Sequence, residues 1–341
     1  MATISVCMIV KNEEKVLARC LDSLSGLWEE LIIVDTGSTD RTKDIAKKYT
    51  EKVFDFSWTG NFSDARNYSF SKAECDYIYS ADADEVLDEE NRERFLLLKE
   101  ALTEDSEIEI VQMYYGNQLS QNSIYNFDKE YRPKLYKRLR KFMWQEPIHE
   151  AVRLDPVIYD SDIVIWHKPH GQHGARDLAY FEKMLDNSEK LSARIQDIYL
   201  RELYFAGEMH NLKRGHEYLV EISEKESPES DVFQKAIAIL CKEARIGGKD
   251  SNFLKYSLKG VASQGSSELC VELGHYFYER EEWAEAVIWY YNAAFETTCQ
   301  MSLKAATSEP LAQLVSCYEK LNMPEMAEEY KKQLKECLAE E

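Results

Sequence analysis

Short apolar runs alternate with amphipathic segments through the first hundred residues of the chain. The runs are rich in β-branched and aromatic residues, and each is followed by a polar turn or a stretch with helical periodicity. Strands are expected at 4–10, 31–35, 52–56 and 77–81, and helices at 14–25, 37–49 and 61–73. Strands separated by helices predict a parallel sheet with helices on both faces, which is an α/β fold.

The pattern changes twice along the chain. Between about 105 and 166, strand-like runs dominate, among them "IEIVQMYYG", "YRPKLYK" and "DIVIWH". The segment 167–174, "HKPHGQHG", is rich in Gly and Pro and predicts a loop at a domain boundary. Everything after 175 has helical periodicity, so we expect two domains, 1–174 and 175–341.

Two segments of the helical half resemble tetratricopeptide helix pairs. In 272–295, Leu273, Gly274 and Ala286 stand where that repeat places packing residues, and 311–336 repeats the pattern. An insertion at 297–310 lengthens the spacing, and a weaker pair is expected around 197–222. A generic helical bundle is the alternative, and the Tyr-rich helix 276–291 is expected to be repeat core rather than a platform for sugars.

Composition and charge limit the kinds of molecule that the protein is expected to bind. The 341 residues are 44% hydrophobic, which is enough for real cores, and the net charge of −20 disfavours nucleic acid and anionic membranes. No apolar run approaches the roughly 20 residues of a membrane span, so no transmembrane segment is expected. The start of the chain predicts a core strand instead of a signal peptide, and eight scattered cysteines indicate a reducing, cytoplasmic location.

The sequence "YIYSADADE" at 77–85 ends an apolar strand with three acids in four residues. Two carboxylates about 4 Å apart repel by roughly 4 kcal/mol at an effective dielectric near 20, so a cation is expected to offset the repulsion. Asp82 and Asp84 are two residues apart, so an extended backbone would point both side chains the same way. Mg²⁺ prefers such oxygen ligands, and Mn²⁺ also accepts imidazole. The alternative is a solvated acidic turn before a helix at 88–102.

Other polar residues follow the neighbouring strands. Asn12 and Glu13 come after the first strand, and Asp35 ends the second. Ligands of open parallel sheets bind beyond the carboxyl ends of the strands, which places these residues at the expected site. No G-x-G-x-x-G sequence and no Walker A sequence is present, so a dinucleotide fold and a P-loop are disfavoured.

Taken together, "CMIVKNEE", "LIIVDTGSTDRT", "DARN" and "YIYSADADE" resemble glycosyltransferase family 2 in order and spacing. The later "RPKLYK", "IHE" and "IWH" resemble its soluble branch with a tetratricopeptide tail. The resemblance implies a GT-A fold and inverting transfer of a sugar from a nucleotide-diphosphate donor, expected to be a UDP-sugar, with Mn²⁺ or Mg²⁺ as cofactor.

The same resemblance implies roles for individual residues. Asp35 would contact the base or ribose, Arg66 the nucleotide, Asp82 the ribose and metal, and Asp84 the metal. His167 would be a late metal ligand, and Glu150 in "IHE" is the candidate base. Asn12 and Glu13 are expected to line the donor site because they follow the first strand. The chain has Glu146-Pro147 where members commonly have Gly, which bears on the acceptor loop and on Glu150.

Plain alternatives exist for several of these residues. His167, His170 and His173 recur every third residue, but Pro169 and two glycines predict a loop, which disfavours a three-histidine zinc site. Arg66 has the alternative of a surface helix position. Glu150 has the equal alternative of an ion pair with Arg132 or Arg138.

Three classes of function remain open. The leading hypothesis is a metal-dependent glycosyltransferase whose tail recruits the acceptor, forms a homodimer, or both. Peptide-modifying enzymes of this architecture, including bacteriocin S-glycosyltransferases, look similar, which favours a peptide or protein acceptor over a glycan. The other two classes are a non-catalytic tetratricopeptide scaffold and a nucleotidyltransferase. Within the leading class, a glycosyltransferase that builds cell-surface glycans is an alternative.

Overall fold

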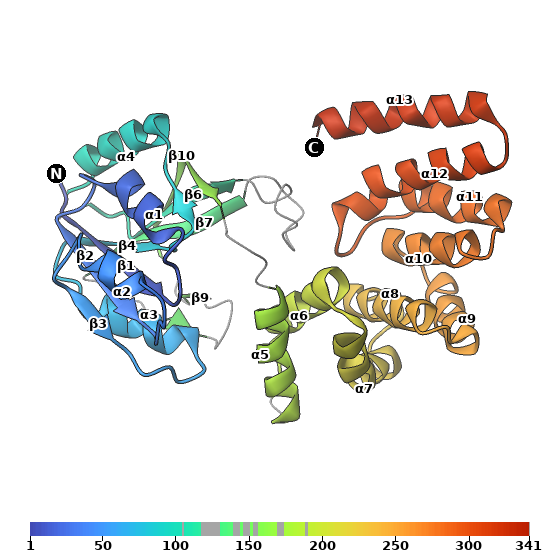
Figure 1. Ribbon diagram of the computed structural model, residues 1–341, viewed down its shortest axis with the longest axis horizontal. Helices are drawn as coiled ribbons and strands as arrows, with labels where there is room; N and C mark the ends of the chain where they lie inside the picture. Colours follow the sequence, from blue (N-terminus) through green and yellow to red (C-terminus); the bar gives the residue numbers. More distant parts are fainter. Residues whose placement is uncertain are drawn as a thin grey trace. The chain divides into compact units, whose positions relative to one another are not determined.

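The computed structural model describes residues 1–103, 106–116, 130–138, 144–145, 151–152, 156–168, 174–187 and 190–340. The chain separates into two compact units, with the division between residues 172 and 173 (Figure 1). The first unit mixes strands and helices, and the described part of the second is helical. An α/β unit followed by an all-α unit is therefore confirmed, while independent domains at 1–174 and 175–341 stay a prediction.

The first unit is built on an eight-stranded mixed sheet with the order β3-β2-β1-β4-β7-β6-β10-β5. Its strands are β1 (Ile4–Val10), β2 (Glu30–Asp35), β3 (Val53–Asp55), β4 (Tyr77–Ala81), β5 (Glu85–Val86), β6 (Ile110–Gly116), β7 (Glu130–Lys137) and β10 (Ile158–His167). A separate pair is formed by β8 (Trp144–Gln145) and β9 (Ala151–Val152).

The parallel prediction is confirmed for only part of this sheet. β3, β2, β1 and β4 are mutually parallel. β7 runs antiparallel to both β4 and β6, and β5 runs antiparallel to β10. The four alternating strands from which the parallel sheet is predicted are thus parallel, and the strand-rich second half of the unit adds the antiparallel strands β7 and β5.

Helices cover both faces of the sheet, as the alternation of side chains in the strands requires. Val6 and Met8 of β1 join one buried cluster, whereas Cys7 between them joins another. The helices are α1 (Leu17–Leu24), α2 (Thr42–Ala46), α3 (Phe62–Phe70) and α4 (Glu89–Ala101). Leu17 and Leu21 of α1 enter the first cluster, and Phe70 of α3 enters the second.

Helix α2 is shorter than the expected 37–49. Asp35 Oδ1 accepts hydrogen bonds from the N–H groups of Gly37 and Ser38, and Asp40 Oδ1 accepts one from the N–H of Thr42. Asp side chains that bind nearby backbone N–H groups offer the chain a turn in place of a helix. The segment before Thr42 is therefore a loop that closes over the end of β2.

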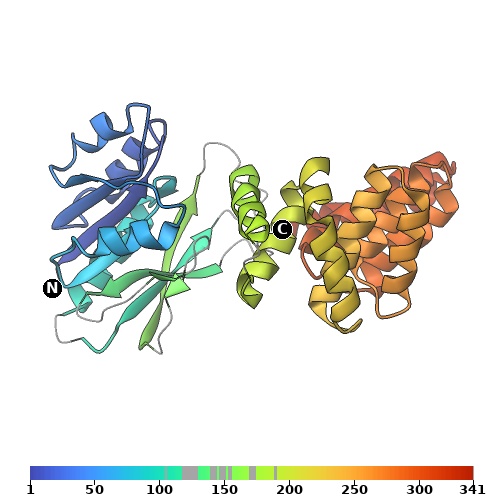
Figure 2. The same cartoon turned by 90° about the horizontal axis from the view of Figure 1, so that it is seen from below.

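The second unit stacks helices in antiparallel pairs, seen from two sides in Figures 1 and 2. The helices are α5 (Gly174–Asp186), α6 (Ala193–Ala206), α7 (Met209–Lys225), α8 (Asp231–Ile246), α9 (Asp250–Val261), α10 (Ser267–Tyr278), α11 (Trp283–Tyr291), α12 (Ser308–Lys320) and α13 (Pro324–Glu340), with a π-helical turn at Asn292–Glu296 and a 3₁₀ turn at Leu303–Ala306. The two predicted repeats correspond to α10 with α11 and α12 with α13. No helix in the described part is long and apolar enough to cross a membrane.

The insertion after the first repeat is held by one buried acid. Glu268 of α10 is fully buried, and its Oε1 accepts hydrogen bonds from the N–H groups of Met301 (2.6 Å) and Ser302 (2.8 Å). Hydrogen bonds to the ionised carboxylate offset the cost of burying it. The longer spacing between the repeats is thus accommodated by a fixed loop.

Candidate functional site

The carboxyl ends of β1, β2 and β4 meet at one edge of the sheet, where the sequence predicts a ligand site. Asp35, the last residue of β2, is only 2% exposed. Its Oδ1 is occupied by the loop that follows, while its Oδ2 is buried with no hydrogen-bond partner among the described residues. An unpaired buried acceptor is costly, and such groups are characteristic of functional positions.

Asn12 and Glu13 are brought to the same loop. Asn12 has a positive φ of 58°, its Oδ1 accepts from the N–H of Thr39 (2.8 Å), and its own N–H donates to Ser38 Oγ (2.9 Å). The N–H of Glu13 donates to Thr42 Oγ1 at 2.7 Å. These bonds tie the end of β1 to the loop around Asp35, so the first two strand ends form one surface.

The acids after β4 lie in a turn and not in an extended strand. The N–H of Glu85 donates to the carbonyl of Asp82 at 3.2 Å, which closes the turn. Asp82 therefore faces different partners from Asp84, and the expectation that an extended backbone aligns the two side chains was wrong. The β-strand ends at Ala81, so the alternation of side chains does not continue through the acids.

Asp82 is held by two cations from distant parts of the chain. Arg66 Nη2 of α3 donates to Asp82 Oδ1 at 2.9 Å, and Lys134 Nζ of β7 lies 3.5 Å from Oδ2. Burial opposes ionisation of Asp82, but the charges of Arg66 and Lys134 hold its pKa well below the usual range. Lys134 also pairs with Glu85, whose pKa burial raises to about 7 against the opposing effect of that lysine.

Asp84 instead meets the end of β10. Its Oδ2 lies 3.1 Å from His167 Nε2, because the short strand β5 pairs with β10 so that Glu85 stands opposite His167. The N–H of Lys168 donates to the carbonyl of Asp84 (2.9 Å), and the Tyr115 ring packs 5.1 Å from the imidazole. Residues 83 positions apart in the sequence are thus joined, as the predicted metal roles of Asp84 and His167 require.

The fit of these side chains to a metal ion is partial. Adjacent ligands at about 2.1 Å from an octahedral ion lie about 3.0 Å apart, close to the separation of Asp84 Oδ2 and His167 Nε2. A carboxylate and an imidazole together suit Mn²⁺ better than Mg²⁺. Among the described residues, however, no group of three His, Cys, Asp or Glu side chains gathers as a metal site, since Asp82 faces the two cations.

Two residues of this site, Lys134 and Glu85, are not predicted from the sequence. Lys134 lies in "RPKLYK", which was assigned no role, and Glu85 was counted only among the crowded acids. The pairing of β6 with β7 shifts at Lys134, so that Leu135 faces Val111 and Pro133 faces Gln112. Such a bulge re-aims a side chain, and no periodic pattern could have located it. The negative charge of Asp82 and Glu85 is therefore offset by Arg66 and Lys134, whereas the sequence suggested a metal ion for this role.

Several candidates fall outside the described residues. They are Glu150, His170 and His173, so the base role and the three-histidine alternative stay untested. The proposed alternative partners of Glu150 have contacts of their own. Arg132 stacks with its guanidinium carbon 4.1 Å from the centre of the Tyr115 ring, and Arg138 Nε donates to the carbonyl of Cys75 at 2.5 Å.

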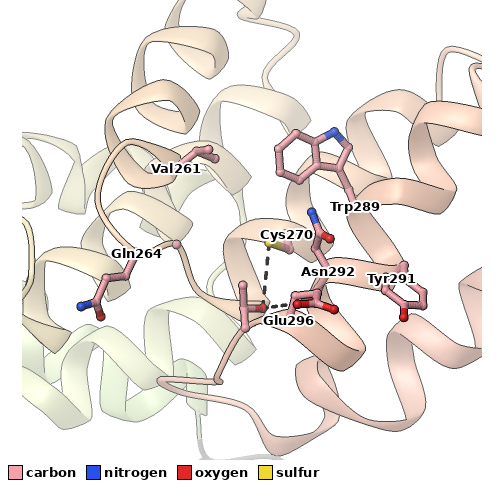
Figure 3. A pocket seen from close by; sticks show the side chains of 9 residues that line it. Val261, Gln264, Cys270, Trp289, Tyr291, Asn292 and Glu296 are labelled. Carbon is pink, nitrogen blue, oxygen red and sulfur yellow. Dashed lines mark hydrogen bonds between the residues drawn. The ribbon is translucent and has the colours of Figure 1, made fainter.

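The helical unit has a pocket of its own (Figure 3). Thr297 Oγ1 donates to the carbonyl of Asn292 at 2.9 Å, which anchors the π-helical turn that forms one wall. The pocket is lined by Val261, Gln264, Gly265, Cys270, Trp289, Tyr291, Asn292, Glu296 and Thr297. None of the predicted site residues lies there. Tyr276 and Tyr290 are core residues as expected, whereas Tyr291 is 41% exposed and lines the pocket.

The fold and the site of the first unit define an α/β protein with its polar site beyond the carboxyl ends of parallel strands. Residues 5–153 match the model of Glycosyl transferase family 2, so this unit contains a domain of that family. The family resemblance carried by the sequence motifs is confirmed, and the fold class expected with it, GT-A, agrees with the mixed sheet.

Related proteins share mainly a short segment. A TPR repeat-containing protein of Synechococcus elongatus is 46% identical over 87 residues, which is 26% of this chain and 22% of that protein. The SPbeta prophage-derived glycosyltransferase SunS of Bacillus subtilis is 37% identical over 92 residues, again 26% and 22%. An uncharacterized glycosyltransferase of Rickettsia typhi is 34% identical over 126 residues, 35% of this chain and 42% of that protein. The chain thus spans less than half the length of these curated relatives.

Solved structures are more distant. Glucosyl-3-phosphoglycerate synthase from Mycobacterium tuberculosis, in complex with Mn²⁺, UDP and phosphoglyceric acid, aligns with 56% of this chain and 80% of its own. The identity is 18% and the TM-score is 0.42. The assignment of the domain therefore rests on the family match and the sequence motifs.

Proposed function

We propose that the protein is a metal-dependent, inverting glycosyltransferase that moves a sugar from a UDP-sugar to a peptide or protein acceptor. The observation that carries the proposal is the turn after β4 in a family 2 domain, where Asp82 is fixed by Arg66 and Lys134 and Asp84 meets His167. A divalent ion bound by Asp84 and His167 would neutralise charge on the departing diphosphate.

The chain's own residues would supply positioning and charge. The side chain of Arg66 is 13% exposed and pairs with Asp82. Its guanidinium would bind an anionic donor by giving up part of its contact with Asp82. Asp35, Asn12 and Glu13 would hold the nucleoside at the ends of β1 and β2. The acceptor must lose a proton as it attacks, and Glu150 stays the proposed base.

The acceptor, assembly and location are further parts of this proposal. Stacked helical pairs present extended binding surfaces, which supports a peptide or protein acceptor and a homodimer through the second unit. All eight cysteines lie in the described part and none forms a disulfide, which fits a cytoplasmic protein. A scaffold without catalysis is the alternative, but the retained Asp82–Arg66 and Asp84–His167 contacts favour an enzyme.

The direct test is release of nucleotide from a panel of UDP-sugars with Mn²⁺, followed by the mass of any product. Wild-type protein should release UDP from at least one donor. Asp84→Ala should not, whereas Asp162→Ala, which removes an exposed acid of β10 that pairs with Arg94 of α4, should behave as wild type. If no nucleotide sugar is turned over under any metal condition, the scaffold alternative is favoured.

A further inference from the structure

Two cations, Arg66 and Lys134, contact Ser80 and Asp82 at the end of β4. Arg66 Nη1 donates to Ser80 Oγ and Nη2 to Asp82 Oδ1, both at 2.9 Å. On the other side, Lys134 Nζ donates to the Ser80 carbonyl at 3.4 Å and lies 3.5 Å from Asp82 Oδ2. The two oxygens of Asp82 therefore each have their own cation, which fixes the plane of the carboxylate.

Lys134 differs from Arg66 in being sealed inside the unit. Its side chain is 6% exposed, its ammonium lies 5.4 Å from the centre of the Tyr115 ring, and it pairs with Glu85, whose side chain is 3% exposed. Glu85 Oε2 in turn accepts from the N–H of Asp82 at 3.2 Å. Lys134, Glu85 and Asp82 thus form a closed ring that holds both the side chain and the backbone of Asp82.

We infer that Lys134 is a positioning residue of the donor site, which fixes Asp82 in the orientation that UDP and its metal ion require. The inference rests on the proposed function of this site. A buried ion pair is weak evidence for stability, because apolar residues of similar volume often stabilise a fold equally well. Lys134 stands at a bulge that directs its side chain toward Asp82. A role in orienting the Asp82 carboxylate explains this placement.

The simpler explanation is that Lys134 only neutralises Glu85. The double variant Lys134→Met/Glu85→Gln distinguishes the two explanations, because it removes both buried charges together. The single variant Lys134→Met leaves Glu85 buried without its cation and should lower the unfolding temperature. The double variant should regain most of that loss, so that a donor-site defect can be measured in a folded protein.

The experiment is calorimetric titration of UDP in the presence of Mn²⁺, with thermal unfolding measured on the same samples. In the double variant we expect UDP affinity to fall by about 10–100-fold, the range typical of residues that orient metal-site ligands. The matched control is Lys99→Met/Glu29→Gln, because Lys99 is a second buried lysine of this unit, 5% exposed in its side chain and 2.6 Å from Glu29. This control should bind UDP as the wild type does.

Each outcome decides the matter. Wild-type affinity in a folded double variant would refute the positioning role and leave the proposed function standing. Failure of the wild-type protein itself to bind UDP with Mn²⁺ would refute the proposed function and the inference with it. Equal loss of affinity in the double variant and in the Lys99 control would show that removing buried charge anywhere in the unit weakens the site, and would also overturn the inference.

Discussion

Asp82 and Asp84 lie two residues apart in the turn after β4, yet their carboxylates have different partners. Asp82 is held between Arg66 and Lys134, whereas Asp84 contacts the imidazole of His167. Against the effect of burial, the charges of Arg66 and Lys134 hold the pKa of Asp82 well below its usual range, whereas Asp84 faces an imidazole. In the proposed function, Asp82 would contact the ribose and the metal, and Asp84 would bind the metal beside His167.

A prediction at this scale concerns the proposed base. Glu150→Gln keeps the size and much of the hydrogen bonding of the side chain but removes its charge. General-base assistance is worth about 10²–10⁴-fold, so sugar transfer should fall by that factor while UDP affinity stays near the wild-type value. Steady-state transfer rates and calorimetric UDP binding measure the two quantities separately.

Two results would contradict this role. Transfer at the wild-type rate would place the base at another acid near the acceptor. A protein that unfolds on substitution would favour the structural alternative, in which Glu150 pairs with Arg132 or Arg138.

The acids of the site were visible in the sequence, but their partners were not. Lys134 lies 52 residues beyond Asp82, and its direction depends on a shift in strand pairing that hydrophobic periodicity does not encode. Arg66 was found because "DARN" belongs to a recognisable set of motifs, but its contact with Asp82 was not foreseen. Sequence patterns therefore located the edge of the sheet, and only the packed structure showed how its charges are balanced.

Among the secondary-structure elements, hydrophobic periodicity predicts most helices and strands. It does not predict the local hydrogen bonds that shorten a helix or the direction in which a strand runs. Helix α2 begins at Thr42 because Asp35 and Asp40 bind backbone N–H groups of the preceding loop. β7 runs antiparallel both to β6, the preceding strand, and to β4, which lies far away in the sequence. Strand propensity is the same for either direction.

The first repeat of the second unit depends on close contact between α10 and α11. A Cβ added to Gly274 would lie 2.5 Å from the ring of Tyr290, which is fully buried and bonded through its hydroxyl to His275 Nδ1 at 2.7 Å. Gly274→Ala should therefore lower the free energy of unfolding by about 1–3 kcal/mol, despite the better helix propensity of alanine. Urea unfolding measures the change.

A double-mutant cycle supplies the control. In a Tyr290→Leu background the added methyl group has room, so Gly274→Ala should cost much less or stabilise the helix. An equal cost in both backgrounds would show that contact with Tyr290 is not the cause.

On the scale of the whole molecule, the two units have separate cores. Clusters of buried residues on both faces of the sheet stabilise the first unit, and further clusters lie between α10, α11, α12 and α13 in the second. The change from alternating strands and helices to helices alone predicts independent domains at 1–174 and 175–341, and this division stays a prediction. The sequence did not predict the pocket beside the π-helical turn, since a π turn leaves no clear periodic signal.

Removal of the last repeats tests what the second unit contributes. Leu269 of α10 packs so closely onto Gly260 that an added Cβ would lie 2.4 Å from its Cδ2, and Ile237 lines the same contact. Deleting residues after 262 exposes this surface, because helical repeats bury their faces against neighbours. We expect poor solubility, or a protein that hydrolyses UDP-sugar slowly but no longer modifies its acceptor. Undiminished transfer to the native acceptor would show that the repeats are dispensable.

In the proposed function, the turn after β4 binds a nucleotide diphosphate together with a divalent ion. Calorimetric titration of UDP into the full chain, with Mn²⁺ and then with excess EDTA, tests it most directly. We expect saturable one-site binding with Mn²⁺ and a large loss of affinity in EDTA. Asp84→Ala should show the same loss with Mn²⁺ present, while its unfolding temperature stays near that of the wild type. UDP binding of equal strength with Mn²⁺, with EDTA and in Asp84→Ala would contradict this proposal.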